Sequence, residues 1–250
     1  MIMKARDLEI QDIVFSKLED SPYITSQRVA IISHKKPKNK LLVQTPVFIS
    51  ETYGIPREGP YYPTARSRSV YKLPFCHERR AFPDELDYEA IEVFYNKLKE
   101  IDMLCSSEGF RIQMFGEKNA QKYEYQPLVR TPDEADEETI VEGKTYYRPP
   151  YTKVKLDMVF DTEQPCFKLF DKTDNSKQAI ELKSFEDVLQ HMRYMTKHRM
   201  VIHFSRLHAM KTSAGHEKKK YGIILKAFAV ECTNKPRCNV GDREADLFID

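Results

Sequence analysis

The sequence has few glycines, and it contains none of the common nucleotide-binding loops. Only 8 glycines occur in 250 residues, and neither G-x-x-x-x-G-K-[ST] nor G-x-G-x-x-G is found. The nucleophile pattern G-x-S-x-G and the zinc-protease pattern H-E-x-x-H are also missing. These absences argue against a phosphate-cradling loop and against the hydrolases that carry those motifs.

Cysteine pairs at short spacing and long apolar runs are missing as well. The 5 cysteines are an odd number and show no zinc-finger or ribbon spacing, so we expect free thiols, no structural metal and no cofactor. No stretch approaches the roughly 20 apolar residues of a membrane span, and the first residues lack the apolar run of a signal peptide. We therefore expect an intracellular protein that makes no contact with membranes.

Charge is segregated along the chain although the formal net charge is only +2. Residues 28–80 contain 11 Lys/Arg against 3 Asp/Glu, and residues 193–226 contain 9 against 1. Residues 81–109 contain 8 acids against 2 bases, and residues 131–142 contain 6 acids and no base. Such segregation predicts strong local fields and favours a basic face that binds a polyanion.

Alternating apolar residues predict a protein that is mainly β, with a few helices. Residues 153–160 place Val154 and Leu156 on one face and Lys153 and Lys155 on the other. Two hairpins are expected, 29–33 with 41–50 and 200–210 with 221–233, and two shorter strands at 69–75 and 110–115.

Two segments have helical spacing, and the pattern as a whole favours a small antiparallel barrel. Residues 84–104 carry an apolar stripe, and residues 184–196 begin with Ser184 and Asp187 at capping-box spacing. Segments 51–68 and 131–150 are expected to be long loops. We predict one domain over residues 1–240 and a short acidic tail over residues 241–250.

Aromatic and basic residues are interleaved in three stretches, GPYYPTARSRSVYK, TYYRPPYTKVK and MTKHRMVIHFSR. A single nucleic-acid strand needs both kinds of side chain, cations for its phosphates and exposed rings for its bases. Each tyrosine taken alone is more often a packed rim residue, and each lysine run is as often a solvated loop. Together the three stretches favour nucleic-acid binding.

Two alternatives stay open at this point. Glu181 and Lys183 form an E-x-K pair which, with Asp157 or Asp171, is typical of metal-dependent nucleases. Such a short match is more often a solvated strand end. A structural or scaffold protein whose basic loops meet acidic partners is the other alternative.

The order of several segments resembles the replicative single-stranded-DNA-binding proteins shared by short-tailed coliphages and large nucleo-cytoplasmic DNA viruses. The matching pieces are LLVQTPVFISETYGI, SVYKLPF, YQPLVR, RPPYTKVKLDMVF, VIHFSRLHAM and KYGIILKAFAVE. The resemblance implies an OB-fold-like five-stranded antiparallel barrel with long insertions, a homodimer or higher oligomer, and no catalysis. It implies a role in viral DNA replication, recombination and repair, at a nuclear or cytoplasmic replication site of an infected host cell.

The resemblance also implies that the acidic tail contacts a viral DNA polymerase or helicase and competes with DNA. The tail residues concerned are Asp242, Glu244, Asp246, Phe248 and Asp250. The predicted phosphate contacts are Lys35, Lys36, Arg66, Arg68, Lys72, Lys153, Lys155, Lys197, Arg199, Arg206, Lys218, Lys219 and Lys220. The predicted stacking rings are Tyr61, Tyr62, Tyr71, Tyr147, Tyr151 and Tyr221.

Overall fold

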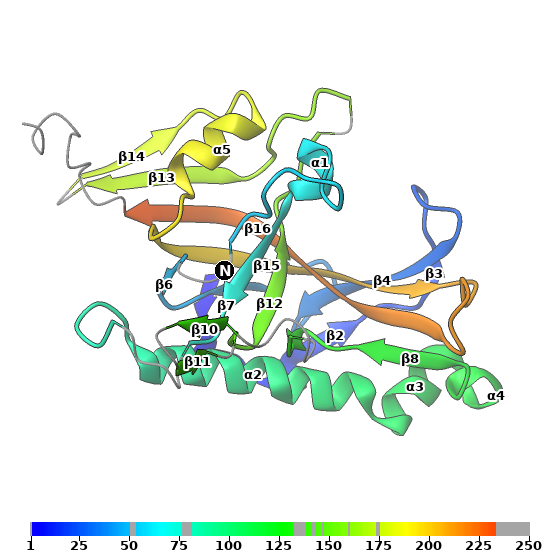
Figure 1. Cartoon of the computed structure of the whole chain (residues 1–250). Coiled ribbons are helices and arrows are strands. Elements are labelled where there is room, and N and C mark those ends of the chain that lie inside the picture. Colours follow the sequence, from blue (N-terminus) through cyan, green and yellow to red (C-terminus); the bar gives the residue numbers. More distant parts are fainter. Residues whose placement is uncertain are drawn as a thin grey trace, which may run out of the picture.

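Two long strands lie at the centre of the fold. Buried and more exposed residues alternate along most of both strands, as expected for strands with one face on the core. In the computed structural model, β15 (Lys197–Met210) and β16 (Lys219–Thr233) pair antiparallel from Lys197 opposite Thr233 to Ala209 opposite Tyr221 (Figure 1). The hairpin predicted at 200–210 and 221–233 is therefore confirmed. The structure describes residues 2–50, 54–76, 82–132, 139–141, 144–146, 148–159, 161–173 and 176–233.

Twelve further strands join these two in one sheet. The 14-stranded sheet has the central order β1-β5-β15-β16-β12-β7, and it curls into an open half-barrel (Figure 1). Its other members are β1 (Ile2–Lys4), β2 (Ile13–Phe15), β3 (Glu19–Asp20), β4 (Gln27–His34), β5 (Leu42–Gln44), β6 (Phe48–Ile49), β7 (Val70–Pro74), β8 (Tyr123–Gln126), β9 (Val129–Arg130), β12 (Tyr151–Lys155), β13 (Lys168–Thr173) and β14 (Ser176–Ile180). Strands β10 (Thr139–Val141) and β11 (Lys144–Tyr146) form a separate pair.

The mainly β class is confirmed, but the sheet differs from the expected antiparallel barrel. It has more strands than a five-stranded barrel, and β16 pairs parallel with β8, β12 and β13. Parallel pairing requires long crossover connections, which explains the length of the segments between these strands. An OB-type barrel within this sheet stays a prediction.

The first predicted hairpin is wrong. Strands β4 and β5 both pair with β15, and the segment between them keeps one isolated bridge, Ser33 to Lys40. Both strands satisfy backbone groups on the same longer neighbour, β15, which has 14 residues. Turn chemistry alone could not reveal this competition.

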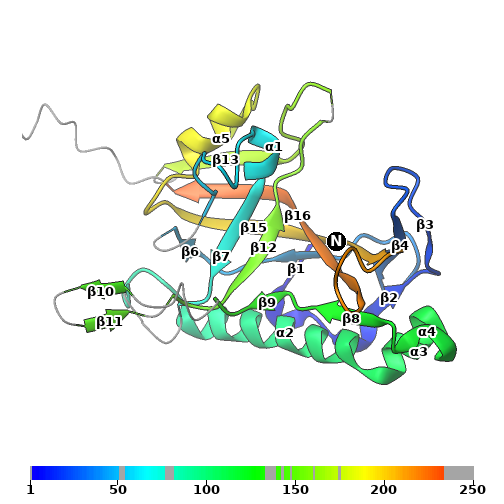
Figure 2. The same cartoon turned by 45° about the vertical axis from the view of Figure 1, so that its right-hand side comes forward.

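Two helices match the sequence predictions, and they lie on different sides of the sheet in Figure 1. Helix α2 (Tyr88–Ser106) runs along the underside of the sheet in Figures 1 and 2. Helix α5 (Phe185–His191) begins at Ser184, whose side chain forms the predicted capping box with Asp187. The remaining helical segments are the 3-10 turns Ala5–Asp7 and Ile10–Asp12, and the helices α1 (Ala65–Arg68), α3 (Glu108–Phe115) and α4 (Glu117–Ala120).

Residues 110–115 were expected to form a strand, and they lie instead in α3. Ser107 caps this helix by accepting a hydrogen bond from the backbone N–H of Phe110 at 3.2 Å. Gly116 ends it with a φ of 76°, a conformation that favours glycine. Phe110 and Phe115 are buried on the inner side of the helix, whereas Ile112 is exposed. Local capping and helical burial therefore override the β propensity of the segment.

The core lies between α2 and the sheet. Ile91, Phe94, Leu98 and Ile101 of α2 are at most 1% exposed. Burying each such side chain contributes about 1.5–3 kcal/mol to folding before entropy is subtracted. On the opposite face, the central strand β15 alternates half-exposed side chains, many of them polar, with its buried ones. Across the described ranges, no helix is both long and apolar enough to span a bilayer.

Candidate nucleic-acid interface

Strands β7 and β12 present basic side chains on the face that points away from the core. On β12, Thr152 and Val154 are fully buried, and Lys153 lies between them on the opposite face. On β7, Tyr71 and Leu73 are fully buried while Lys72 is directed outward. Lys72 and Lys153 are register partners, so their side chains are cross-strand neighbours on the same face.

Two arginines join these lysines from other strands. Arg130 of β9 lies opposite Tyr151 of β12 and adds to the positive field at Lys153. Arg206 of β15 acts, together with Arg130, on the imidazole of His208. We call Lys72, Arg130, Lys153 and Arg206 the cationic cluster. Four strands from distant parts of the sequence build it.

The electrostatics of the cluster are those of like charges held together. Burial, followed by the charges of Arg130 and Lys72, lowers the pKa of Lys153. Within the described part of the chain, no carboxylate forms an ion pair with Lys153 or Arg130. Burial and neighbouring arginines likewise lower the pKa of His208. The fold therefore concentrates positive charge here, and the described carboxylates do not pair with Lys153 or Arg130.

Arg206 gives a second sign of missing anionic partners. Its Nε atom is buried and has no hydrogen-bond partner among the described residues, and the same holds for Nδ1 of His208. A buried unpaired donor costs about 1–3 kcal/mol, so such groups generally have a role. An anion over this face would accept hydrogen bonds from several of these donors.

A groove of about 430 Å³ runs beside the cluster, and we call it the first groove. Lys72, Arg130 and Tyr151 line it at one end and Lys220 at the other. The Nζ atom of Lys72 lies 4.9 Å from the centroid of the Tyr151 ring. The lining residues are Lys72, Glu124, Tyr125, Gln126, Pro127, Val129, Arg130, Thr131, Pro132, Arg148, Tyr151 and Lys220. The groove therefore combines several cations with one accessible ring.

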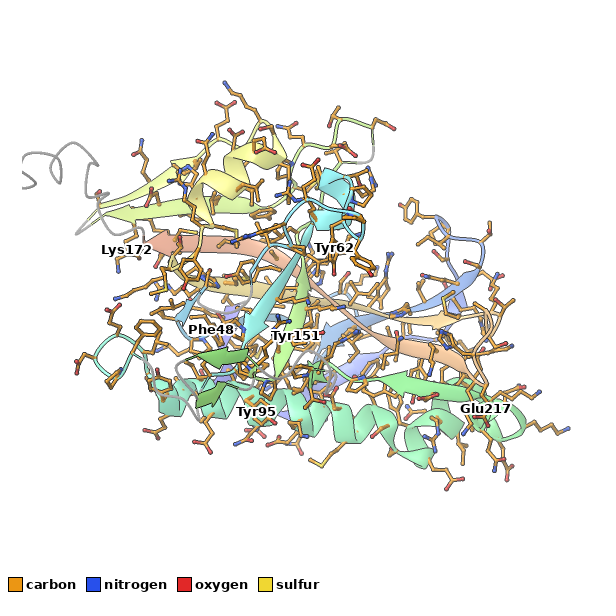
Figure 3. All side chains as sticks on the ribbon, in the orientation of Figure 1. Phe48, Tyr62, Tyr95, Tyr151, Lys172 and Glu217 are labelled. Carbon is orange, nitrogen blue, oxygen red and sulfur yellow. The ribbon has the colours of Figure 1, made fainter. Side chains whose placement is uncertain are left out.

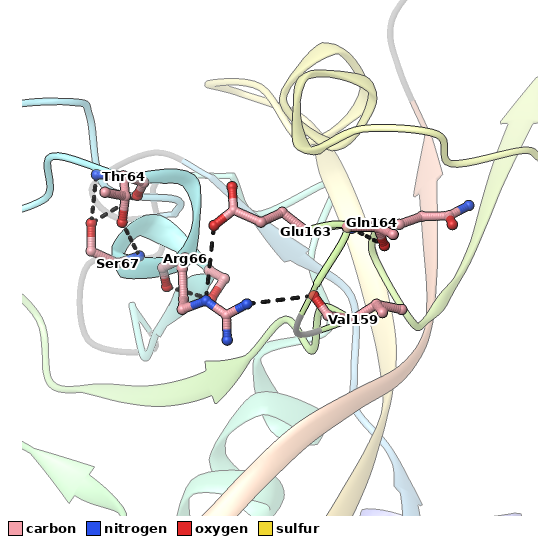
Figure 4. A network of polar contacts seen from close by, with 8 residues as sticks. Thr64, Arg66, Ser67, Val159, Glu163 and Gln164 are labelled. Atoms are coloured by element: carbon pink, nitrogen blue, oxygen red, sulfur yellow. Dashed lines mark hydrogen bonds and ion pairs between the residues drawn. The ribbon is translucent and has the colours of Figure 1, made fainter.

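Seven of the 13 predicted phosphate contacts form ion pairs within the protein. The pairs are Lys35–Asp12 (3.2 Å), Arg66–Glu163 (3.9 Å), Arg68–Glu58 (3.5 Å), Lys155–Asp157 (3.6 Å), Lys197–Glu85 (2.7 Å), Arg199–Glu231 (2.8 Å) and Lys220–Glu124 (2.7 Å). Figure 4 shows Arg66 held between Glu163 and the carbonyl oxygen of Val159. These cations are already partly neutralised within the protein, and their role as phosphate contacts stays a prediction.

The lysine run 218–220 does not act as one basic clamp. Lys220 donates to Glu124, and this hydrogen bond lowers the pKa of that carboxyl. The Nζ atom of Lys219 lies 5.6 Å from the Tyr123 ring centroid. Lys218 is exposed in the loop, as is Lys36 in the turn after β4. Only Lys220 of the run lines the first groove.

Two of the predicted stacking rings are wrong, because both lie in the core. Tyr71 and Tyr221 are 0% exposed. The hydroxyl of Tyr71 is hydrogen-bonded to Oγ of Ser50, and the hydroxyl of Tyr221 donates to the carbonyl oxygen of Cys105. Burial raises the pKa of both phenols. Their rings stabilise the fold and are closed to bases.

The other stacking candidates differ in their surroundings. Tyr151 lines the first groove, and Tyr62 is half-buried beside α1 (Figure 3). Tyr61 is 90% exposed. Tyr147 and the acidic tail (Asp242, Glu244, Asp246, Phe248 and Asp250) lie outside the described residues.

The E-x-K pair lacks the surroundings of a nuclease centre. Lys183 and Glu181 lie 3.8 Å apart with side chains 76% and 81% exposed. Asp157 is held by Lys155 and Lys226, and Asp171 by His191 at 3.5 Å. Among the residues that the structure describes, no three His, Cys, Asp or Glu gather in a group able to hold a metal ion. The two candidate aspartates therefore have other partners.

Sequence reasoning missed two residues of the first groove as binding residues, Arg130 and Arg148. Arg130 ends a strand of two residues, too short to show any period, and Arg148 precedes two prolines. The segment YQPLVR, which follows α4, held a usable signal for Arg130. In this segment the arginine lies two residues beyond the apolar Leu128.

Comparisons with known proteins give one relative and no family. No family model matches the chain. An uncharacterized protein of Acanthamoeba polyphaga mimivirus is 27% identical over 217 residues. The match covers 78% of this chain and 51% of the relative, so the chain spans about half the length of the curated relative it matches. The sequence is therefore similar to part of a viral protein.

Proposed function

We propose that this protein binds single-stranded DNA without sequence preference and carries out no chemistry on it. The observation that carries the proposal is the cationic cluster beside the Tyr151 ring. Lys153 and Arg130, like charges held together without an ion pair to a described carboxylate, stabilise a bound polyanion, because each phosphate relieves their mutual repulsion. An unpaired strand also offers a base to the ring, which a duplex does not.

The finer expectations belong to the same proposal. An OB-type barrel in the curled sheet, a homodimer or higher oligomer, and a tail that meets a viral polymerase or helicase all fit such a role. The mimivirus relative supports a viral setting, where DNA replication, recombination and repair require a protein that coats single strands.

The direct test compares labelled poly-dT of about 16 nucleotides with duplex DNA of equal length. Stacking on Tyr151 at about 1–3 kcal/mol predicts binding of the single strand that is about fivefold to a hundredfold tighter. Four cluster cations at about −0.7 each predict a slope of about −3 for log affinity against log salt. Equal affinity for both forms of DNA would contradict the proposal and favour the scaffold alternative.

The pKa of Lys153 predicts an unusual pH dependence. Burial and like charges lower this pKa from the ordinary 10.5, whereas a bound phosphate favours the ammonium form. Affinity for poly-dT should therefore fall, by up to about tenfold, as the pH rises through the lowered pKa of the free protein. In that same window the unfolded chain binds more protons than the folded chain, so the free energy of unfolding should rise with pH.

Lys153→Gln is the comparison for both measurements. In the wild type, both changes are expected as the pH rises from the lowered pKa of Lys153 to 10.5. The variant should show neither the fall in affinity for poly-dT nor the rise in the free energy of unfolding over that pH range. Fluorescence anisotropy with labelled poly-dT measures the first effect, and urea unfolding without DNA measures the second. Identical pH profiles for the wild type and Lys153→Gln would exclude Lys153 as a phosphate contact.

A further inference from the structure

A second groove of about 500 Å³ lies on the other side of β7 from the first groove. Its lining residues are Ser50, Gly54, Ile55, Pro56, Arg57, Tyr62, Lys72, Met192, Arg193 and Tyr194. They come from the segment before β7 and from the turn between α5 and β15. Figure 3 places the labelled Tyr62 next to α1 and Tyr151 on β12, the strand that pairs with β7.

The side chains of the second groove have the chemistry of a single-strand site. Two rings line it, Tyr62 and Tyr194, and the latter is 72% exposed. Two guanidiniums line it, those of Arg57 and Arg193, and none of its described lining residues is a carboxylate. Among the described residues, neither arginine has an ion-pair partner. Rings interleaved with cations that lack carboxylate neighbours match bases interleaved with phosphates.

Lys72 connects the two grooves, since it lines both of them. Its backbone N–H donates to the carbonyl oxygen of Gly54 at 3.0 Å, which attaches the segment after residue 53 to the open edge of β7. The grooves are therefore neighbours across one strand. A ligand that reaches Lys72 from Tyr151 can continue directly toward Tyr62.

The walls of the second groove are fixed by contacts that do not use its lining rings. Nε of Arg68 donates to the carbonyl oxygen of Pro56 at 3.0 Å, and its guanidinium lies 5.7 Å from the Phe185 ring centroid. Arg68, predicted as a phosphate contact, instead joins one wall to α5. In the turn that carries Tyr194, Met195 donates its backbone N–H to the carbonyl oxygen of Ser50 at 3.0 Å. The rings are thus presented on supported backbone, which lowers the entropy lost on binding.

We propose that the second groove continues the first, so that one extended DNA strand crosses Lys72 and occupies both. In the second groove, bases stack on Tyr62 and Tyr194, and phosphates meet Arg57 and Arg193. This inference rests on the proposed function, which the first groove carries by itself. It adds a path for the DNA strand. It also groups Arg57, Tyr62, Arg193 and Tyr194 into one site, which the sequence patterns did not do.

Binding should depend on oligonucleotide length in a way that separates the two grooves. An oligo-dT of about 4 nucleotides fills the first groove alone, and one of about 16 nucleotides reaches the second. The double variant Arg57→Ala/Arg193→Ala should weaken binding of the longer strand by about tenfold and leave the shorter strand within about twofold. The double variant Lys155→Ala/Arg199→Ala removes two paired cations and serves as the control of equal net charge.

A fluorescent reporter makes the path visible without a loss of affinity. The chain contains no tryptophan, so Tyr194→Trp introduces a single indole whose fluorescence a stacked base quenches. We expect quenching by the longer strand and none by the shorter strand. Quenching that is equal with both lengths would contradict the serial path.

The outcomes separate this inference from the proposed function. If Arg57→Ala/Arg193→Ala leaves the longer strand unaffected while Arg130→Ala/Lys153→Ala weakens it, the extension is wrong and the function stands. If neither double variant weakens binding, both are wrong. Equal weakening of the short and long strands by the second-groove variant would also overturn the extension.

Discussion

Replacing Arg130 and Lys153 together by alanine is expected to weaken binding of single-stranded DNA by about a hundredfold. Each of these cations lacks an ion-pair partner among the described residues, and each contributes to the same field over the first groove. Losing one charge-assisted phosphate contact costs about 1.5–3 kcal/mol, or roughly tenfold or more in affinity. The salt slope should become shallower by about 1.4, at about 0.7 per contact.

The same control double variant, Lys155→Ala/Arg199→Ala, tests whether position or total charge decides this result. It removes two positive charges, as the first-groove variant does, but from side chains paired with Asp157 and Glu231. Lys226 and Lys177 remain beside those carboxylates, so neither acid is left without a partner. We expect a loss of less than about threefold, because paired surface cations release few counterions. Equal losses in the two double variants would mean that net charge attracts DNA and that the groove is not the site.

The double variant Arg130→Ala/Lys153→Ala should be at least as stable as the wild type, although it binds DNA more weakly. Removing Lys153 relieves its repulsion with Lys72 and Arg130, which burial strengthens. Thermal unfolding of Arg130→Ala/Lys153→Ala should therefore occur at a temperature equal to or above that of the wild type. Weakened DNA binding by a fully folded variant assigns the loss to the surface and not to the fold.

The sequence predicted those elements whose signals are local. The alternation in 200–210 and 221–233 specifies β15 and β16, and the capping box at Ser184 specifies the start of α5. Each of these signals lies within a few residues of the element it defines. Pairing partners are decided elsewhere, so the hairpin expected between 29–33 and 41–50 was wrong.

Part of the site could also have been predicted more sharply from alternation. Tyr71 shares its face with Leu73, and Tyr221 shares its face with Ile223, so strand period alone assigns both rings to the core. The same rule correctly places Lys153 outward, beside Tyr151. Arg130 could not be found this way, since β9 has 2 residues and is positioned by long-range contacts. The ion pairs between individual lysines and acids far away in the sequence could not be predicted either, since they depend on the tertiary fold.

Asp102→Ala is expected to lower the free energy of unfolding by about 3–5 kcal/mol, more than most single substitutions. Asp102 is a buried carboxylate of α2 that accepts hydrogen bonds from the backbone N–H groups of Leu128 (2.8 Å) and Val129 (3.0 Å). It also accepts one from the hydroxyl of Tyr125 at 2.9 Å. Burial raises its pKa, although these three hydrogen bonds oppose the shift. Alanine would leave three buried donors without an acceptor.

This carboxylate also supports the first groove, because its three donors lie on β8, on β9 and between them, and this segment leads directly to Arg130. Glu92→Ala, on the exposed side of the same helix, is the matched control and should change stability by less than about 0.5 kcal/mol. Asp102→Asn keeps one oxygen acceptor and should cost less than the alanine variant. Urea unfolding followed by circular dichroism measures all three, and an Asp102→Ala protein within about 1 kcal/mol of wild type would contradict the anchoring role. Under conditions where Asp102→Ala remains folded, weaker poly-dT binding would show that α2 positions Arg130 through this carboxylate.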